Sequence, residues 1–179
     1  NDEKVFDRMR RIRFLGMEKK KMSSGHWNGK YYAIEHGTNS RLDEVHAAIL
    51  SVKLKYLDKW IEKRRKIAKI YDDTLSNIEQ VTLPVKLENT DPVYHIYPIL
   101  VENRENFINY LREEGVSTGI HYPIPLHLQK AFSYLGHKVG DFPNSEKICF
   151  NEVSLPIFPY MEEDDIYYVC EKIKQYFKT

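Results

Sequence analysis

Apolar residues recur at helical spacing over two long parts of the chain. The first part opens with Asn1 and Asp2, whose side chains can cap a helix, and we expect Gly16 to end that helix. The second part covers residues 40–77, where leucine, isoleucine and valine keep the same spacing. Because this length exceeds that of an ordinary globular helix, we expect a bend or break near residues 56–58.

Strand patterns appear in the C-terminal half. Residues 93–101 are apolar, β-branched and aromatic, which predicts a buried strand with His95 as a packed strand residue. Residues 104–114 follow as an amphipathic helix that Gly115 ends. Shorter patterns predict strands at residues 116–120 and 153–157, and helices at residues 143–150 and 162–177. This order of elements predicts a small α+β domain.

Residues 19–30 have a polar composition rich in serine, asparagine and glycine. Such a segment buries little apolar surface and favours turns. We interpret it as a flexible loop and a candidate lid.

The charge balance argues against a polyanionic partner such as a nucleic acid or an anionic membrane. Among 179 residues, 27 Lys and Arg stand against 26 Asp and Glu, so the chain has no net positive field for a nucleic acid or an anionic membrane. The basic run at residues 59–66 is interrupted by Glu62, and we interpret it as a solvated helix face. No apolar run approaches the length of about 20 residues that crosses a bilayer, which predicts a cytoplasmic protein.

The two cysteines, Cys149 and Cys170, are too few for a disulfide framework and lack the paired spacing of a zinc site. We expect reduced thiols and propose no metal site from them.

A first candidate site lies at residues 37–44, where a glycine turn leads through Asn39 and Arg41 into the predicted helix. Backbone N–H groups at a helix N-terminus, an amide and a guanidinium together suit a phosphate group. In the alternative interpretation, Ser40 or Asn39 only caps the helix and Arg41 pairs with Asp43 or Glu44.

A second candidate site lies at residues 121–127, where His121, Tyr122 and His127 stand on a backbone stiffened by Pro123 and Pro125. Rigidly held imidazole and phenol groups can donate to a phosphate or to sugar hydroxyls. A histidine at the end of a strand can equally be a structural residue, and the segment alone does not decide between the two readings.

An ordered set of segments resembles one enzyme family. The segments are Gly37-Thr38-Asn39-Ser40-Arg41-Leu42-Asp43-Glu44, Leu57-Asp58-Lys59-Trp60, Asp91-Pro92-Val93-Tyr94-His95, residues 121–127, and Leu155-Pro156-Ile157-Phe158-Pro159. In this order they resemble the DegT/DnrJ/EryC1/StrS family of pyridoxal-phosphate-dependent sugar aminotransferases. The likeness covers nearly the whole chain.

The resemblance implies a particular place in a larger fold. The chain would be the C-terminal α+β small domain of a fold-type-I, aspartate aminotransferase-like enzyme, with a long linking helix. Residues 1–36 would be the end of the large cofactor domain and a mobile loop. Residues 37–77 would form linking and dimer-interface helices, and residues 78–179 the small domain.

The resemblance also implies the roles of individual residues. Asn39, with Arg41 near it, would hold the phosphate of pyridoxal 5'-phosphate in the neighbouring subunit of a homodimer. His121, Tyr122 and His127 would face the nucleotide-linked keto-sugar or its diphosphate. The family's cofactor lysine lies upstream of the first residue, so no catalytic residue is assigned and the chain alone is expected to be inactive.

The implied reaction is amino transfer from glutamate to a keto-deoxysugar nucleotide. The form of the motifs is most similar to family members that aminate C3 of a dTDP-3-keto-6-deoxyhexose. Two alternatives stay open. One is a sugar dehydratase of the same family that depends on pyridoxal or pyridoxamine phosphate, and the other is a non-catalytic regulatory or binding domain.

Overall fold

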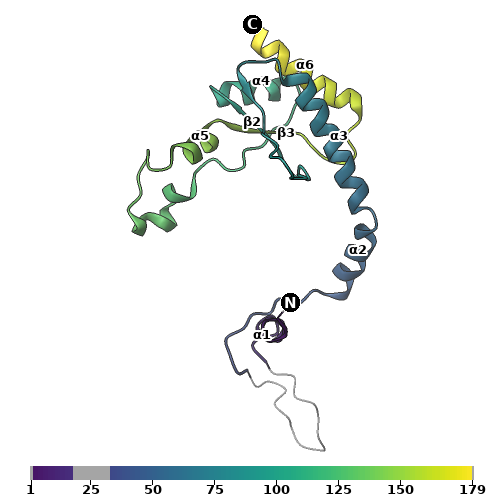
Figure 1. Cartoon of the computed structure of the whole chain (residues 1–179), viewed down its shortest axis with the longest axis vertical. Coiled ribbons are helices and arrows are strands. Elements are labelled where there is room, and N and C mark those ends of the chain that lie inside the picture. The colour runs from purple at the N-terminus through teal and green to yellow at the C-terminus, as the bar shows by residue number, and fades with distance from the viewer. Residues whose placement is uncertain (1, 18–32, 179) are drawn as a thin grey trace, which may run out of the picture. The chain divides into compact units, whose positions relative to one another are not determined.

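The computed structural model describes residues 2–17 and 33–178 (Figure 1). The candidate lid at residues 19–30 lies outside the described residues. The chain divides into two compact units, Asn1–Lys55 and Tyr56–Thr179, which we describe one after the other.

The first unit contains helices α1 (Glu3–Ile12) and α2 (Glu44–Leu54). The carboxylate of Asp2 caps α1 as predicted, since it accepts hydrogen bonds from the backbone N–H groups of Lys4 and Val5. Neither helix buries a residue within the described part of the chain. Their apolar side chains therefore lie exposed on their surfaces.

Two glycines allow the segments between these helices to cross closely. A Cβ atom on Gly37 would lie 2.1 Å from the backbone nitrogen of Gly16, and a Cβ atom on Gly16 would lie 1.8 Å from the carbonyl oxygen of Glu35. Gly16 also has a φ of +70°, a conformation that favours glycine. This close approach allows backbone hydrogen bonds between residues 38–40 and residues 12–15. For example, the N–H of Thr38 donates to the carbonyl oxygen of Ile12 at 2.8 Å.

The predicted break in the long helical region is confirmed. Helix α2 ends at Leu54, and α3 (Leu57–Leu75) begins after Lys55 and Tyr56. The break coincides with the boundary between the two units. The assignment of residues 37–77 to linking and dimer-interface helices stays a prediction.

The second unit contains a three-stranded antiparallel sheet in the order β1-β2-β3. The strands are β1 (Val81–Thr82), β2 (Tyr97–Val101) and β3 (Glu152–Leu155). The strand predicted at residues 93–101 is too long, because pairing starts only at Tyr97. The strand predicted at residues 116–120 is wrong, because that segment makes a single bridge, between Gly119 and Ser154.

The predicted helices of the second unit are confirmed as α4 (Arg104–Glu113), α5 (Pro143–Asn151) and α6 (Glu163–Lys178). Gly115 follows α4 with a φ of +77°. Two 3-10 turns, η1 (Leu126–Leu128) and η2 (Lys130–Leu135), follow the proline-containing segment. The mixture of helices and an antiparallel sheet confirms the predicted α+β class.

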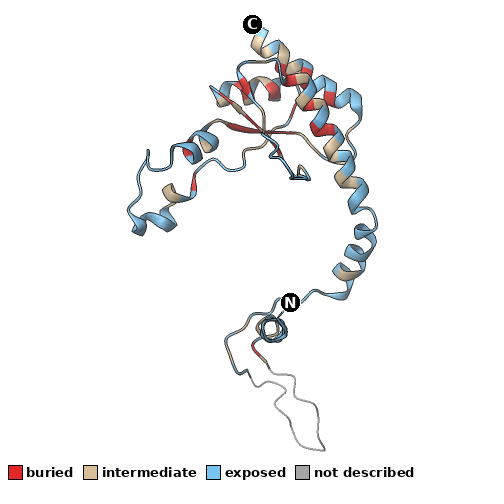
Figure 2. Cartoon of the chain, in the orientation of Figure 1, coloured by how far each residue is buried: buried red, intermediate tan, exposed pale blue. Residues whose placement is uncertain are grey.

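The hydrophobic core of the described chain lies in this second unit (Figure 2). Helix α3 packs against α6, and α4 packs against both α6 and β3. Tyr71 of α3 and Tyr97 of β2 are fully buried with ring centroids 4.9 Å apart. The hydroxyl of Tyr71 donates to the carbonyl oxygen of Pro156 at 2.8 Å, and that of Tyr97 donates to the carboxylate of Asp72.

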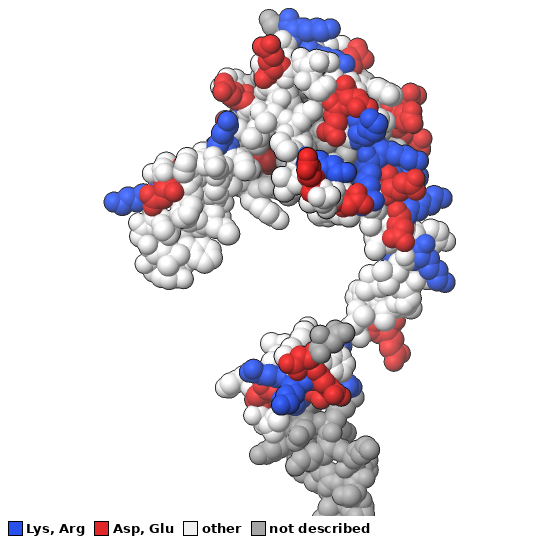
Figure 3. All heavy atoms as spheres, in the orientation of Figure 1, with Lys and Arg blue, Asp and Glu red and all other residues white. Residues whose placement is uncertain are grey.

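The interpretation of residues 59–66 as a solvated face holds for only part of the run. Acidic side chains interrupt the basic ones along the outside of α3 (Figure 3). Arg64 and Arg65, however, turn inward to backbone carbonyl groups. Nη1 of Arg64 lies within 3.0 Å of the carbonyl oxygens of Tyr94, His95 and Ile157. These two arginines therefore hold the irregular segment before β2 in place.

Candidate functional site

An arginine-rich pocket lies in the first unit. It has a volume of about 640 Å³, which is within the range of small-molecule sites. Its lining residues come from α1, the turn after it and the segment before α2; they are Asp7, Arg10, Arg11, Arg13, Phe14, Met17, Arg41 and Leu42. Four guanidinium groups against one carboxylate give this pocket a positive charge.

Asn39 and Arg41 are brought together at this pocket. Nε of Arg41 donates to Oδ1 of Asn39 at 3.0 Å, and its guanidinium carbon lies 4.9 Å from the ring centroid of Phe14. Phe14 and Asn39 also form a backbone bridge. Because Oδ1 is engaged by Arg41, the NH₂ group is what the side chain of Asn39 can offer to a ligand.

The structural alternative for this segment is wrong in its details. Helix α2 begins at Glu44, and its cap is Asp43, not Ser40 or Asn39. Asp43 accepts the backbone N–H of His46 at 2.8 Å, and this bond lowers the pKa of its carboxyl group. Since α2 starts several residues after Asn39, the expected position of Asn39 and Arg41 at the mouth of the helix is also wrong. The pocket, not the helix N-terminus, is what surrounds Arg41.

Glu35 neutralises another part of the arginine cluster. Its carboxylate accepts from Nε of Arg8 at 3.1 Å and from Nε of Arg11 at 3.0 Å. Both bonds lower the pKa of Glu35, and the bond from Arg8 has the larger effect. Arg10, Arg13 and Arg41 are the lining arginines outside these two pairs. Guanidinium groups and an amide NH₂ suit the oxygens of a phosphate.

The second candidate site follows Gly119, which forms a backbone bridge with Ser154 of β3. The backbone N–H of His121 donates to Oε2 of Glu152 at 2.6 Å, and its Nδ1 lies 2.9 Å from Oγ of Ser154. Tyr122 follows through a cis peptide bond, and its side chain is 72% exposed. His121 and Tyr122 lie edge to face with ring centroids 5.7 Å apart. His121 is thus fixed by the sheet, while Tyr122 is open to a ligand.

His127 has a different environment. Its side chain is only 8% exposed, and Nε2 lies 2.9 Å from Oε1 of Glu146. The Glu146 carboxylate also accepts the backbone N–H groups of Gly140 and Phe142, and the bond from Gly140 is the main cause that lowers its pKa. These contacts tie η1 to the start of α5. They favour a structural role for His127 over its predicted contact with substrate.

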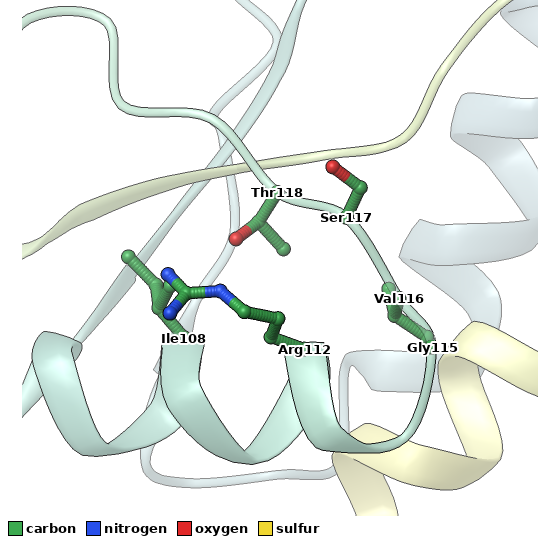
Figure 4. A pocket seen from close by; sticks show the side chains of 6 residues that line it. All are labelled: Ile108, Arg112, Gly115, Val116, Ser117 and Thr118. Carbon is green, nitrogen blue, oxygen red and sulfur yellow. The ribbon is translucent and has the colours of Figure 1, made fainter.

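The interpretation of His95 as a packed strand residue is wrong, because it is exposed and lies in the bend before β2. A hollow between the end of α4 and residues 115–118 is lined by Arg112, Ser117 and Thr118 among others (Figure 4). Its volume of about 170 Å³ is below the usual size of a ligand pocket.

Residues 2–17 and 33–178 contain neither a membrane-spanning helix nor a metal-binding cluster. No helix there is long and apolar enough to cross a membrane. No group of three or more His, Cys, Asp or Glu side chains there could hold a metal ion.

Known proteins resemble this chain over nearly its whole length. A family model described as the DegT/DnrJ/EryC1/StrS aminotransferase family matches residues 1–174. The chain belongs to this family. The match confirms the resemblance inferred from the ordered motifs.

Two relatives illustrate the family. The chain is 39% identical to the "Pleiotropic regulatory protein" of Geobacillus stearothermophilus, over 99% of this chain and 46% of that protein. It is also 39% identical to the dTDP-3-amino-3,6-dideoxy-alpha-D-galactopyranose transaminase of Aneurinibacillus thermoaerophilus, over 98% of this chain and 45% of that protein. The chain therefore spans less than half the length of these DegT/DnrJ/EryC1/StrS relatives.

Solved structures agree on the fold. DesV of S. venezuelae, determined in complex with a ketimine intermediate, matches with a TM-score of 0.89 and 31% identity, over 99% of this chain and 45% of that chain. The similarity to DegT/DnrJ/EryC1/StrS aminotransferases confirms the predicted fold.

Sequence reasoning about this family member missed four residues of the two sites. Arg10 and Arg13 were part of the predicted first helix, and nothing in the helical spacing indicated that they line a pocket with Arg41. Glu152 and Ser154 did leave a signal. A charged and a polar residue two positions apart share one face of a strand, and here every residue of that strand is buried.

Proposed function

We propose that this chain is the C-terminal part of a nucleotide-sugar aminotransferase that uses pyridoxal 5'-phosphate. The observation that carries the proposal is the joining of Asn39 and Arg41 at a pocket lined by Arg10 and Arg13, in a chain that belongs to an aminotransferase family. The names of the relatives, among them transaminases for dTDP-linked and UDP-linked sugars, support a keto-sugar nucleotide as substrate.

The residues of the arginine pocket fit the phosphate of the cofactor. Arg41 is pre-oriented by Asn39 and by the Phe14 ring, so little side-chain freedom is lost when an anion binds. We propose that the NH₂ group of Asn39 and the guanidinium of Arg41 contact this phosphate in the neighbouring subunit of a homodimer. When bound, the cofactor supplies the electron sink for the transfer of an amino group.

His121 and Tyr122 are proposed to bind the sugar nucleotide. His121 is held by two contacts to β3, and the exposed Tyr122 hydroxyl can donate to a sugar or diphosphate oxygen. His127 belongs to this set only as a support, since it pairs with Glu146 beneath η1.

The finer proposal is amino transfer from glutamate to C3 of a dTDP-3-keto-6-deoxyhexose. The dTDP-3-amino sugar named for the transaminase relative supports it. A regulatory function without chemistry is a second candidate, which the name of the Geobacillus relative favours. A complete protein that binds the cofactor and the sugar nucleotide but does not transfer an amino group would support this second candidate.

The test separates the two ligands in the complete enzyme that carries this chain. Loss of a hydrogen bond costs about 0.5 to 1.5 kcal/mol when the ligand group is a neutral hydroxyl and about 1.5 to 3 kcal/mol when it is a charged diphosphate, so His121→Ala or Tyr122→Phe should weaken binding of the sugar nucleotide about two-fold to a hundred-fold. Affinity for pyridoxal 5'-phosphate should not change. Each ligand is titrated separately by calorimetry.

Two exposed residues of the same types serve as controls. Tyr134→Phe and His95→Ala should leave both affinities unchanged, because these side chains are exposed in η2 and before β2. Weaker cofactor binding with normal sugar binding in the His121 and Tyr122 variants would reverse the assignment.

A further inference from the structure

A buried carboxylate and a buried hydroxyl lie within hydrogen-bond distance of His121. Glu152 and Ser154 are 1% and 5% exposed, and they lie two positions apart on one face of β3. Glu152 receives two hydrogen bonds, from the backbone N–H of His121 at 2.6 Å and from the hydroxyl of Ser154. Ser154 in turn lies 2.9 Å from Nδ1 of His121. The three residues form a closed chain of hydrogen bonds.

The directions of these bonds determine which imidazole nitrogen carries the proton. As a carboxylate, Glu152 can only accept, so the single proton of the Ser154 hydroxyl points to Glu152. The oxygen of Ser154 must then accept from Nδ1 of His121. In the neutral ring, Nδ1 therefore carries the hydrogen, and Nε2, across the ring, presents a lone pair.

The backbone of Gly119 fixes the position of the same ring. Gly119 pairs with Ser154 through two backbone hydrogen bonds of 3.0 and 2.9 Å. A Cβ atom on residue 119 would lie 2.7 Å from Cε1 of His121, closer than carbon atoms can approach. The imidazole therefore packs directly against this glycine, and both its position and its tautomer are determined by the segment around β3.

We propose that Glu152 and Ser154 are positioning residues that hold His121 as a hydrogen-bond acceptor for a sugar hydroxyl. A neutral Nε2 with a lone pair can accept from a hydroxyl group, whereas a diphosphate oxygen has no hydrogen to donate. The identity of the ligand rests on the proposed function. The tautomer of His121 does not depend on it.

Glu152→Gln provides a sharp test because it reverses the chain of bonds. The backbone N–H of His121 is a fixed donor, so the amide oxygen of the new side chain must face it and the NH₂ group must face Ser154. Ser154 then accepts from the amide and donates its own proton to Nδ1. The substitution, which hardly changes the volume of the side chain, should move the hydrogen of His121 from Nδ1 to Nε2.

Long-range ¹H–¹⁵N correlation spectra of the full chain report this tautomer directly, at an alkaline pH where free imidazole is neutral. We expect Nδ1–H in the unchanged chain, Nε2–H in Glu152→Gln, a mixture in Ser154→Ala, and restored Nδ1–H in Ser154→Thr, which keeps the hydroxyl. Loss of signals in His121→Ala assigns them. Ser117→Ala, an exposed serine, should leave the spectrum unchanged.

The proposal is overturned if the unchanged chain shows Nε2–H, or if Glu152→Gln folds and keeps Nδ1–H. Backbone amide spectra establish whether each variant folds. If Glu152→Gln does not fold, Ser154→Ala and Ser154→Thr decide in its place, and an unaltered tautomer in folded Ser154→Ala overturns the proposal.

Titration of the complete enzyme identifies the ligand group. Glu152→Gln should weaken binding of a dTDP-linked sugar about five-fold, the value of one neutral hydrogen bond, and leave dTDP itself unchanged. Tighter binding of both ligands would show that His121 faces the diphosphate and would overturn the hydroxyl assignment. If the unchanged enzyme binds no sugar nucleotide while the spectra show Nδ1–H, the proposed function fails and the positioning role stands.

Discussion

Arg64 shows how the partners of one residue decide its role. It lies in a run of basic residues on α3, yet its guanidinium contacts three carbonyl groups from two distant segments, at Tyr94, His95 and Ile157. Partial burial lowers its pKa, but the group stays charged because guanidinium is a very strong base. Arg64 therefore joins the start of β2 to the segment after β3.

Removing this side chain should destabilise the second unit. Arg64→Ala is expected to lower the free energy of unfolding by about 2 to 3 kcal/mol, because hydrogen bonds from a charged donor are lost and carbonyl groups are left without a partner. Lys66→Ala, two residues further along α3, is the matched control. Its side chain is 73% exposed and, among the residues that the structure describes, its ammonium pairs with Glu62, so we expect a change below about 0.5 kcal/mol. Urea denaturation of both variants measures the difference, and equal effects would contradict the role of Arg64.

Single residues differ in how far the sequence reveals them. The capping role of Asp2 follows from local chemistry and is confirmed, because a cap needs only its own helix. Arg64 and Glu152 take their roles from residues 30 or more positions away, which no local pattern contains. Asn39 and Arg41 were singled out by their motif, but the bond between them and the surrounding arginines became visible only in the fold.

At the scale of elements, helices were predicted well and strands less well. An amphipathic helix such as α4 or α6 satisfies its own backbone, so its apolar spacing suffices to define it. The segment before β2 has the composition of a strand, yet Arg64 and Arg65 bind the carbonyl groups of Asp91, Pro92, Tyr94 and His95. Hydrogen bonds from α3 side chains thus replace strand pairing there. As a result, β2 begins at Tyr97, four residues later than predicted.

The packing of α3, β2 and α6 predicts a loss of stability at alkaline pH. Burial raises the pKa of the Cys170 thiol from 9.0 to about 11, and burial also raises the pKa of Tyr71 and Tyr97 above the ordinary 10.0. A group whose pKa is raised in the folded state loses its contribution as the pH rises past the unfolded pKa. The contribution of these three groups to stability should therefore be constant well below pH 9 and fall as the pH rises past it.

Between about pH 9 and pH 10, the fall should approach about 1.4 kcal/mol per pH unit for the one thiol, and the two tyrosines should make it steeper at higher pH. Urea denaturation at a series of pH values measures the slope. Cys170→Ala should remove the fall below pH 10, while Cys149→Ala, at a half-buried position, should keep it. A slope that is the same in both variants would assign the effect to other groups.

At the scale of the whole molecule, the two units differ in what holds them together. Every residue of the core cluster lies in Tyr56–Thr179, whereas Gly16 is the one buried residue among the described residues of Asn1–Lys55. Exposed apolar side chains such as Val45 and Leu54 lie on α2. The described part of the first unit, residues 2–17 and 33–55, therefore buries too little surface to stabilise it by itself.

Hydrogen exchange of the 179-residue chain should show this difference. Amides of β2, β3 and the buried parts of α3 and α6 should exchange slowly, while those of α1 and α2 should exchange within seconds because local opening costs little. In a longer protein that carries this chain, further residues or a second subunit can cover the apolar faces of α1 and α2, and we expect both helices to become protected there. Strong protection of α1 in the 179-residue chain would contradict this.

The proposed dimer gives the last prediction. If Asn39 contacts the cofactor phosphate of the neighbouring subunit, one active site needs Asn39 from one chain and the cofactor lysine from the other. A mixed dimer with Asn39→Ala in one subunit and the lysine replaced in the other then has both defects in the same site and keeps one intact site. When both defects lie in one subunit, they fall in different sites, and neither site is intact.

Aminotransferase activity of the two purified heterodimers should therefore differ, with about half of the full activity in the first and little in the second. The reverse pattern, with activity only when both defects lie in one subunit, would show that Asn39 serves its own subunit. Equal activities would show that the site does not need Asn39, and either result would remove the support for a shared site.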